Sequence, residues 1–248
     1  MIFMTDHLVM GLHYQRFIEQ LAKTSAYQIG NQSQYCPEEV FFNPTSPLAG
    51  KRIGFLGSSV TYGVAAMGNS FVEYLQARDG IWVQKSAVSG STMAGSEKNG
   101  YLTRLQNDFQ AKEYDLMVCQ LSTNDNRYGK VMGRVTANEQ RSGFNTNTTL
   151  GAIEAICAII KERWDCSLVF FTCLQTDPDE QYQLLIDQLK LLQVKWGFEI
   201  IDLFNNQAFQ TSLRVRPNAM VDSIHPTQLG YLKVWLPLFE EELKQILV

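Results

Sequence analysis

An aspartate and a histidine stand three residues apart in the segment Asp222–Pro226 (DSIHP). The chain has three histidines, and the other two, His7 and His13, precede any strand-like run. On one tight turn, the carboxylate of Asp222 can hold the imidazole of His225 in one tautomer and leave its other ring nitrogen free as a base. The same pattern also fits a surface or capping histidine, so the catalytic interpretation requires a nucleophile elsewhere in the chain.

A serine in a glycine-flanked loop is the candidate nucleophile. Ser59 lies in Gly57–Gly63 (GSSVTYG), directly after the apolar run 52–56, where a hydroxyl can lie beside a base. A lone serine in such a loop is more often a helix cap or a turn residue. The loop is not the G-x-S-x-G elbow, because Thr61 stands at the last position, and no lysine follows as in a phosphate-binding loop. No G-x-G-x-x-G follows the apolar run, so a dinucleotide site has little support.

Strand-like and helix-like segments alternate along the chain. The predicted strands are 52–56, 81–87, 116–121, 167–173 and 198–203. The predicted helices are 7–29, 70–78, 99–111, 148–164, 178–196 and 227–247. Thr148 or Thr149 is the expected cap of the fourth helix, Pro178 the expected start of the fifth, and Pro237 interrupts the last. This alternation predicts an α/β fold, a three-layer αβα sandwich around a parallel five-stranded sheet.

Polar segments follow four of the predicted strands. Besides Gly57–Gly63, they are Ser89–Thr92 after the second strand, Ser122–Asp125 after the third, and Asp222–Pro226 after the fifth. Ligands of parallel sheets bind beyond the carboxyl ends of the strands. We therefore expect these four segments to gather at one edge of the sheet.

Together the four segments resemble the four blocks of the SGNH (GDSL) hydrolase family. They match, in order, the Gly-Asp-Ser block, the block with the oxyanion-hole glycine, the Gly-x-Asn-Asp block and the Asp-x-x-His-Pro block, from Gly57 to Pro226. Each match alone is weak, whereas four matches in order, each after its own predicted strand, form a strong pattern. The resemblance implies the flavodoxin-like SGNH hydrolase fold.

The resemblance also implies a carboxylic ester hydrolase, a serine esterase acting on small acyl or acetyl esters, with carbohydrate esters as one candidate. It assigns Ser59 as nucleophile, His225 as base and Asp222 as the partner of His225. It assigns the oxyanion hole to Ser59, Gly90 and Asn124. No cofactor and no metal is expected. Two alternatives stay open: a non-catalytic carbohydrate- or ligand-binding module that kept the fold, and an acyltransferase using the same triad.

Two positions depart from the family pattern. Ser58 replaces the aspartate of the first block, which leaves open whether Ser58 or Ser59 is the nucleophile. The apolar residue directly after Ser59 favours Ser59. Ser122 replaces the glycine of the third block and is expected to narrow or stiffen the loop that carries Asn124. Asp125 is expected to form hydrogen bonds within that loop.

The polar stretch 126–147 is long for a connection in a compact domain, and such loops are often functional. Arg127 and Tyr128 are candidate substrate-binding residues, and Arg134 and Arg141 are further candidates in the same loop. The competing interpretation is an ordinary solvated loop face.

Length and composition set the remaining expectations. The 248 residues fit an N-terminal helical extension, 1–50, that packs on a hydrolase domain, 51–248. A lid or a dimer contact are alternative roles for the extension. The net charge of −4 and the lack of basic stretches argue against nucleic-acid binding.

The cysteines and the apolar runs of the chain bear on its redox state and location. Five cysteines without a C-x-x-C pair indicate reduced thiols and no metal site. The N-terminus does not resemble a signal peptide, and no apolar run is long enough to span a bilayer. We therefore expect a cytoplasmic protein with a small-molecule ester substrate and no membrane partner. Homo-oligomerisation stays open.

Overall fold

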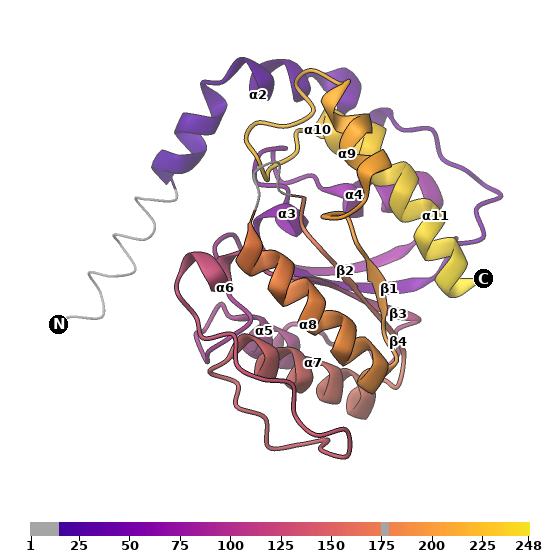
Figure 1. Ribbon diagram of the computed structural model, residues 1–248. Coiled ribbons are helices and arrows are strands. Elements are labelled where there is room, and N and C mark those ends of the chain that lie inside the picture. The colour runs from indigo at the N-terminus through magenta and orange to yellow at the C-terminus, as the bar shows by residue number, and fades with distance from the viewer. Residues whose placement is uncertain (1–14, 175–178) are drawn as a thin grey trace.

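A computed structural model describes residues 15–174 and 179–248 (Figure 1). Five parallel strands form one sheet in the order β2-β1-β3-β4-β5. The strands are β1 (Arg52–Gly57), β2 (Trp82–Ala87), β3 (Leu116–Gln120), β4 (Ser167–Phe171) and β5 (Glu199–Ile201). All five strand predictions are confirmed within a few residues, and so is the flavodoxin-like three-layer fold.

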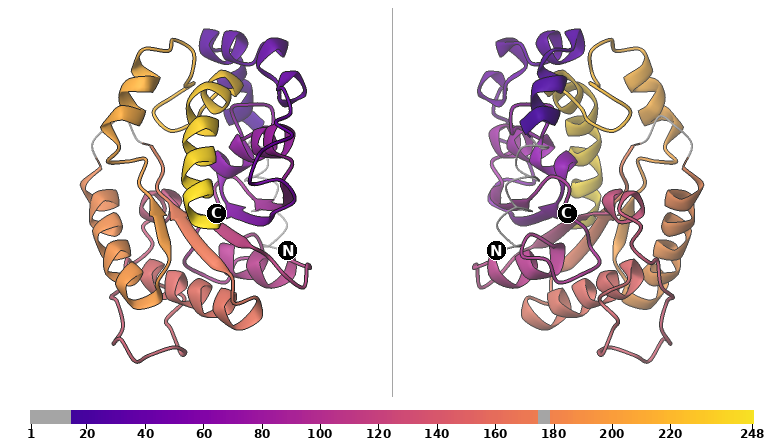
Figure 2. Two further views of the ribbon diagram at one scale, coloured as in Figure 1. Left: turned by 90° about the vertical axis from the view of Figure 1, so that its right-hand side faces the viewer. Right: turned by 90° about the vertical axis from the view of Figure 1, so that its left-hand side faces the viewer.

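Helices cover both faces of the sheet (Figures 1 and 2). One face carries α4 (Phe71–Asp79), the π-helical turn η3 (Tyr231–Trp235) and α11 (Leu236–Leu247). The other face carries α5 (Tyr101–Asn107), α7 (Thr149–Arg163) and α8 (Glu180–Trp196). Because β1, β3 and β4 are covered on both sides, they are almost continuously apolar and buried.

Shorter elements lie in the connections. They are α2 (Ser25–Gly30), η1 (Ser33–Tyr35), η2 (Pro37–Glu39), α3 (Ser59–Tyr62), α6 (Asn124–Arg127), α9 (Gln207–Arg214) and α10 (Gln228–Gly230). The sequence pattern predicts no helix at α9, although Asn206 caps it by accepting a hydrogen bond from the backbone N–H of Phe209. Eight residues offer too few periodic positions for a reliable prediction.

The C-terminal helix is continuous from Gln228 to Leu247 but changes pitch on the way. Residues Tyr231–Trp235 form a π-helical turn directly before α11. Pro237 lies in the first turn of α11, and it has no N–H to donate to the preceding turn. The sequence predicts an interruption near Pro237, and the structure has a π-helical turn just before it instead of a break.

Three predicted helices differ in extent from those in the structure. The predicted helix 99–111 is α5, which ends at Asn107. The predicted helix 7–29 is two helices, residues 15–22 and α2, separated where Thr24 caps α2 through the backbone N–H of Tyr27; residues 7–14 lie outside the described residues. Helix α8 begins at Glu180 with Asp179 as its cap, and Pro178 lies outside the described residues. Thr148 caps α7, as predicted.

A buried ion pair fixes the long loop that follows α6. Lys195 of α8 and Glu154 of α7 form a salt bridge, and their side chains are 1% and 0% exposed. Thr136 joins the pair, since its hydroxyl donates to Glu154 over 3.0 Å and accepts from Lys195 over 2.7 Å. The loop is thus attached to two helices at its centre.

Two further expectations from the sequence concern the cysteines and membrane-spanning helices. All five cysteines are free thiols, and burial raises the pKa of Cys119, Cys157 and Cys173. Within residues 15–174 and 179–248, no helix combines the length and apolarity needed to cross a bilayer.

Replacing Lys195 by Met should lower the free energy of unfolding by about 3–5 kcal/mol, because Glu154 would stay buried without its partner. Urea denaturation measures the change. Lys190→Met is the matched control on the same helix: Lys190 is 49% exposed and lies 3.5 Å from Asp202, so its loss should cost under about 1 kcal/mol. Equal losses in the two variants would contradict this account of the loop.

Candidate active site

The carboxyl ends of the strands carry the four predicted polar segments. The order of the sheet reverses between β1 and β3, the position where parallel sheets commonly bind ligands. Ser59 begins α3 directly after β1, and Asn124 begins α6 after β3. The turn that carries His225 precedes α10 and returns to the same edge of the sheet (Figure 1).

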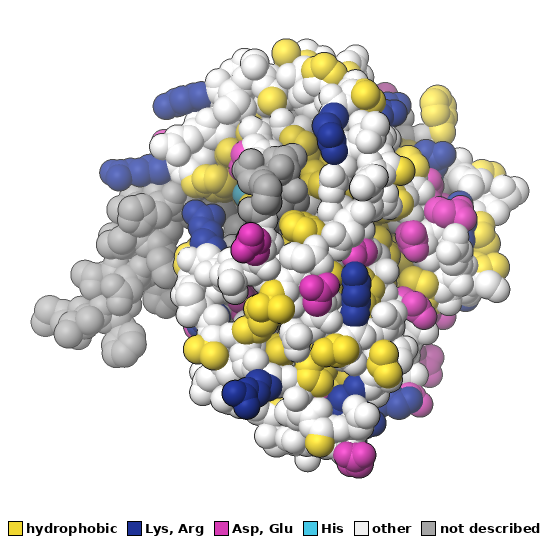
Figure 3. Space-filling model, viewed as in Figure 1, with side chains coloured by type: hydrophobic (Ala, Val, Ile, Leu, Met, Phe, Trp, Pro, Cys, Tyr) yellow, Lys and Arg dark blue, Asp and Glu magenta, His cyan; other side chains and the backbone are white. Residues whose placement is uncertain are grey.

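Three side chains form one continuous hydrogen-bonded chain. The Nε2 atom of His225 lies 2.9 Å from Ser59 Oγ, and its Nδ1 atom lies 2.7 Å from Asp222 Oδ2. His225 is 7% exposed, whereas Ser59 is half-buried. Figure 3 shows the exposed part of His225, the one histidine of the described residues, as a small cyan patch on the surface.

The Asp222 carboxylate is held by its own turn. Its Oδ1 atom accepts the backbone N–H of Ile224 over 2.8 Å and that of His225 over 2.7 Å. Burial alone would raise the pKa of this carboxyl, but the hydrogen bond and charge of His225, together with the two backbone N–H groups, lower it overall. Asp222 is therefore ionised near neutral pH and suited to stabilise a protonated imidazole.

The neighbouring serine, Ser58, points into the protein and is 0% exposed. Its Oγ atom accepts from Gln120 Nε2 over 2.8 Å. Gln120 Oε1 in turn accepts the backbone N–H groups of Ser58 and Thr61 and the hydroxyl of Thr61. The structure thus separates the two candidate serines: only Ser59 contacts His225.

Gly90 and Asn124 present N–H groups near this serine loop. Gly90 has a φ of +77°, a left-handed conformation that favours glycine. Among the described residues, no acceptor lies within hydrogen-bonding distance of its N–H. Asn124 Nδ2 donates one hydrogen to the carbonyl of Ser91 over 3.0 Å, which orients the amide and leaves its second hydrogen available.

Ser122 and Asp125 connect the loops that carry Asn124 and Gly90. The Ser122 hydroxyl donates to the Ser91 carbonyl over 3.3 Å and accepts the backbone N–H of Asn124 over 3.1 Å. Asp125 was expected to bond within its own loop, but its carboxylate accepts from Met93, Ala94 and Thr149 on neighbouring segments. Both residues therefore fix one loop against another, because the Ser91 partner of Ser122 and all three partners of Asp125 are distant in sequence.

Arg104 was not identified from the sequence, although its side chain is 4% exposed beneath these loops. Its guanidinium donates five hydrogen bonds, all to uncharged oxygens. Two of these acceptors are the carbonyl of Gly57, 2.8 Å away, and the hydroxyl of Ser91, 3.0 Å away. Arg104 therefore joins the end of β1 to the loop after β2. The available sequence signal was a lone arginine within the apolar pattern of the helix 99–111.

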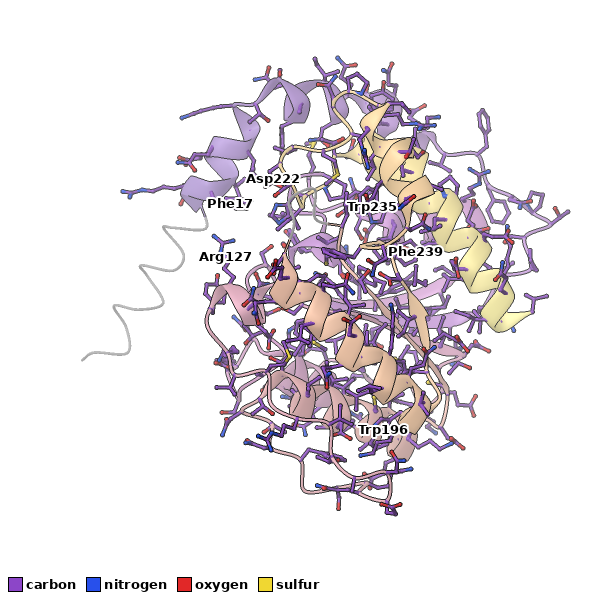
Figure 4. The ribbon with its side chains drawn as sticks, in the orientation of Figure 1. Phe17, Arg127, Trp196, Asp222, Trp235 and Phe239 are labelled. Carbon is purple, nitrogen blue, oxygen red and sulfur yellow. The ribbon has the colours of Figure 1, made fainter. Side chains whose placement is uncertain are left out.

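The four candidates from the long loop lie in different places. Tyr128 is 56% exposed, and its Oη lies 3.4 Å from the position that a Cβ on Gly90 would occupy. The guanidinium of Arg127 lies 6.0 Å from the Tyr128 ring centre, and Figure 4 shows Arg127 on the same side of the molecule as Asp222. Both residues are thus at the rim of the site.

Arg134 and Arg141 do not join this rim. Arg134 is exposed to solvent. Arg141 packs over Trp196 at 5.1 Å and lines a cavity of about 470 Å³ next to Ser167, where β4 begins. That is the amino end of the strands, opposite the serine. Within the described part of the chain, no cluster of three His, Cys, Asp or Glu side chains is arranged to hold a metal ion.

Comparisons with known proteins bear on the family and the fold of the chain. A model of the GDSL-like lipase/acylhydrolase family matches residues 55–233. No curated protein matches the chain.

Several solved structures share the fold. A protein from Lactobacillus plantarum is 17% identical, with a TM-score of 0.59 over 79% of this chain and 98% of that one. A protein from Bacteroides ovatus, assigned as a GDSL-like lipase, is 13% identical, with a TM-score of 0.59 over 79% and 99%. A family two carbohydrate esterase from Clostridium thermocellum, solved in complex with cellohexaose, is 10% identical, with a TM-score of 0.51 over 78% and 65%. At these identities the likeness shows the fold alone.

The contact between His225 and Asp222 predicts one tautomer. The neutral imidazole should carry its proton on Nδ1 and accept at Nε2, and the Asp222→Ala variant should show a mixture of tautomers. Nitrogen-15 NMR of the ring distinguishes the two forms, and a His225→Gln sample assigns the signals against His7 and His13. An Nε2–H tautomer in the unaltered protein would contradict the geometry described above.

Proposed function

The chain belongs to the GDSL-like lipase/acylhydrolase family, as its four motifs predict, and we propose that it is a serine esterase of small acyl or acetyl esters. The observation that carries this proposal is the chain of hydrogen bonds from Ser59 through His225 to Asp222. A nucleophile, a base and a carboxylate in this arrangement are the working parts of serine hydrolases on several unrelated folds.

In the proposed first step, the Ser59 Oγ atom bonds to the carbonyl carbon of the ester. His225 Nε2 takes the hydroxyl proton, and the carbonyl π electrons move to oxygen. When this tetrahedral intermediate collapses, the bond to the alcohol breaks, and His225 gives its proton to the departing oxygen. Water then attacks the acyl-enzyme by the same steps and releases the acid. Asp222, ionised by its hydrogen bonds, stabilises the protonated imidazole in both halves.

Three donors are proposed to stabilise the oxyanion: the backbone N–H groups of Ser59 and Gly90 and the free amide hydrogen of Asn124. Two observations support this assignment: the Gly90 N–H has no hydrogen-bond acceptor among the described residues, and Asn124 has a fixed orientation. Such donors already point at the developing charge, so the site needs little reorganisation during the reaction. One donor of this kind typically contributes about 3–4 kcal/mol to transition-state stabilisation.

Acetylated carbohydrates are the first natural substrate class to test. One structural neighbour is a carbohydrate esterase, and the rim residues Arg127 and Tyr128 offer polar and aromatic contacts that suit a hydroxyl-rich alcohol. We propose that Arg127 and Tyr128 contact the substrate beside Gly90.

Turnover of 4-nitrophenyl acetate and of an acetylated oligosaccharide tests the proposal. Ser59→Ala should reduce kcat by several orders of magnitude, as removal of a triad member does. Ser58→Ala, the matched control, should reduce kcat by less than about tenfold, because it removes one buried neutral hydrogen bond to Gln120.

Circular dichroism must show that both variants are folded. Full activity in Ser59→Ala would refute the nucleophile assignment. A folded, unaltered protein that cleaves no ester would refute the esterase and favour a binding module.

A further inference from the structure

The N-terminal extension lies against the candidate active site. In the helix 15–22, Leu21 is buried against Val64 and Ala65, which directly follow α3. Asn31 Nδ2 donates to the carbonyl of Ala65 over 2.8 Å, and Asn31 Oδ1 accepts the backbone N–H of Gln228 over 2.9 Å. The extension is thus fixed both to the segment after Ser59 and to the helix that follows His225.

This anchoring brings Phe17 to the catalytic histidine. The two rings meet edge to face, with centres 5.6 Å apart and planes at 64°. Phe17 is only half-buried, and Val221, on the turn of His225, packs on the same apolar cluster. Figure 4 shows Phe17 close to Asp222 and on the same side of the molecule as Arg127. The imidazole therefore has an apolar neighbour that the four family motifs do not provide.

The position of Phe17 matters because ester cleavage places the leaving alcohol beside His225. The Nε2 atom that contacts Ser59 must also return a proton to the departing oxygen. That oxygen must come within hydrogen-bonding distance of Nε2, so the alcohol attached to it lies beside the imidazole. A ring that touches the imidazole and keeps part of its surface free is positioned to contact that alcohol.

We propose that Phe17 forms one wall of the subsite for the leaving alcohol and selects alcohols with a flat apolar face. The C–H face of a pyranose and the face of an aryl ring both have this chemistry, and both pack well on an aromatic side chain. The proposal rests on the esterase function proposed above and adds a determinant of its substrate range. The family model begins at residue 55, so this selectivity is a property of the extension and not of the family domain.

Steady-state kinetics on three acetates tests the proposal with the full-length protein: an acetylated glucopyranoside, phenyl acetate and ethyl acetate. Phe17→Ala should lower kcat/KM roughly tenfold, mainly through KM, for the glucopyranoside, the phenyl ester or both. The change for ethyl acetate should stay below about twofold, because its alcohol is too small to reach the ring. Phe17→Trp should restore the loss. The ester that is affected identifies a sugar or an aryl alcohol.

Ile18→Ala is the matched control, since Ile18 packs on the same apolar cluster as Phe17 but carries no aromatic ring for the alcohol to pack on. It should leave the selectivity between the three esters unchanged. An equal fall on all three esters in Phe17→Ala would overturn the proposal and show that Phe17 holds the imidazole. The same selectivity change in Ile18→Ala, or no change in Phe17→Ala, would also overturn it. Failure of the esterase itself gives a different result, namely no turnover of any ester by the unaltered protein.

Discussion

One hydrogen bond, from Ser59 to His225, joins two side chains that are 166 residues apart, and the fold is what brings them together. The serine follows the first strand, and the histidine precedes the last helix. A parallel sheet places the carboxyl ends of all its strands at one edge, so segments far apart in the chain meet there without long connections. Additional contacts hold the segments of Ser59 and His225 together. The Tyr231 hydroxyl donates to the carbonyl of Val60 over 2.6 Å, and Asn31 connects the same two regions from outside.

Buried polar side chains give this edge its rigidity. Gln120, Arg104 and Asp125 each lie beneath a different pair of loops, and each forms several hydrogen bonds there. A buried polar group that is fully hydrogen-bonded permits few alternative arrangements, because any displacement leaves a donor or acceptor without a partner. The hydrogen bond from Gln120 also gives Ser58 a structural role at the position where the family has an aspartate. An amide and a hydroxyl pair here without adding a charge beside the nucleophile.

The sequence predicted the parts of the structure that depend on local pattern. Apolar runs identified the five strands, and the four polar segments identified Ser59, Gly90, Asn124 and the Asp222–His225 turn. Residues whose role depends on long-range contacts were missed or misplaced. In the sequence, nothing distinguishes Arg104 from the rest of its helix or Gln120 from the rest of its strand, because their hydrogen-bond partners lie far away in the chain. Arg141 seemed equivalent to Arg127 within one polar loop, yet the loop runs to the opposite end of the sheet. No sequence motif marks Phe17, since only the packing of the extension brings it to His225.

The proposed esterase depends on Ser59 being the nucleophile that His225 activates. Reaction with a serine-directed fluorophosphonate, followed by peptide mass mapping, tests it most directly. We expect a single adduct on Ser59 that disappears in His225→Ala, because the hydroxyl needs the base to become nucleophilic. An adduct on Ser58, or no adduct on a protein shown to be folded, would contradict it.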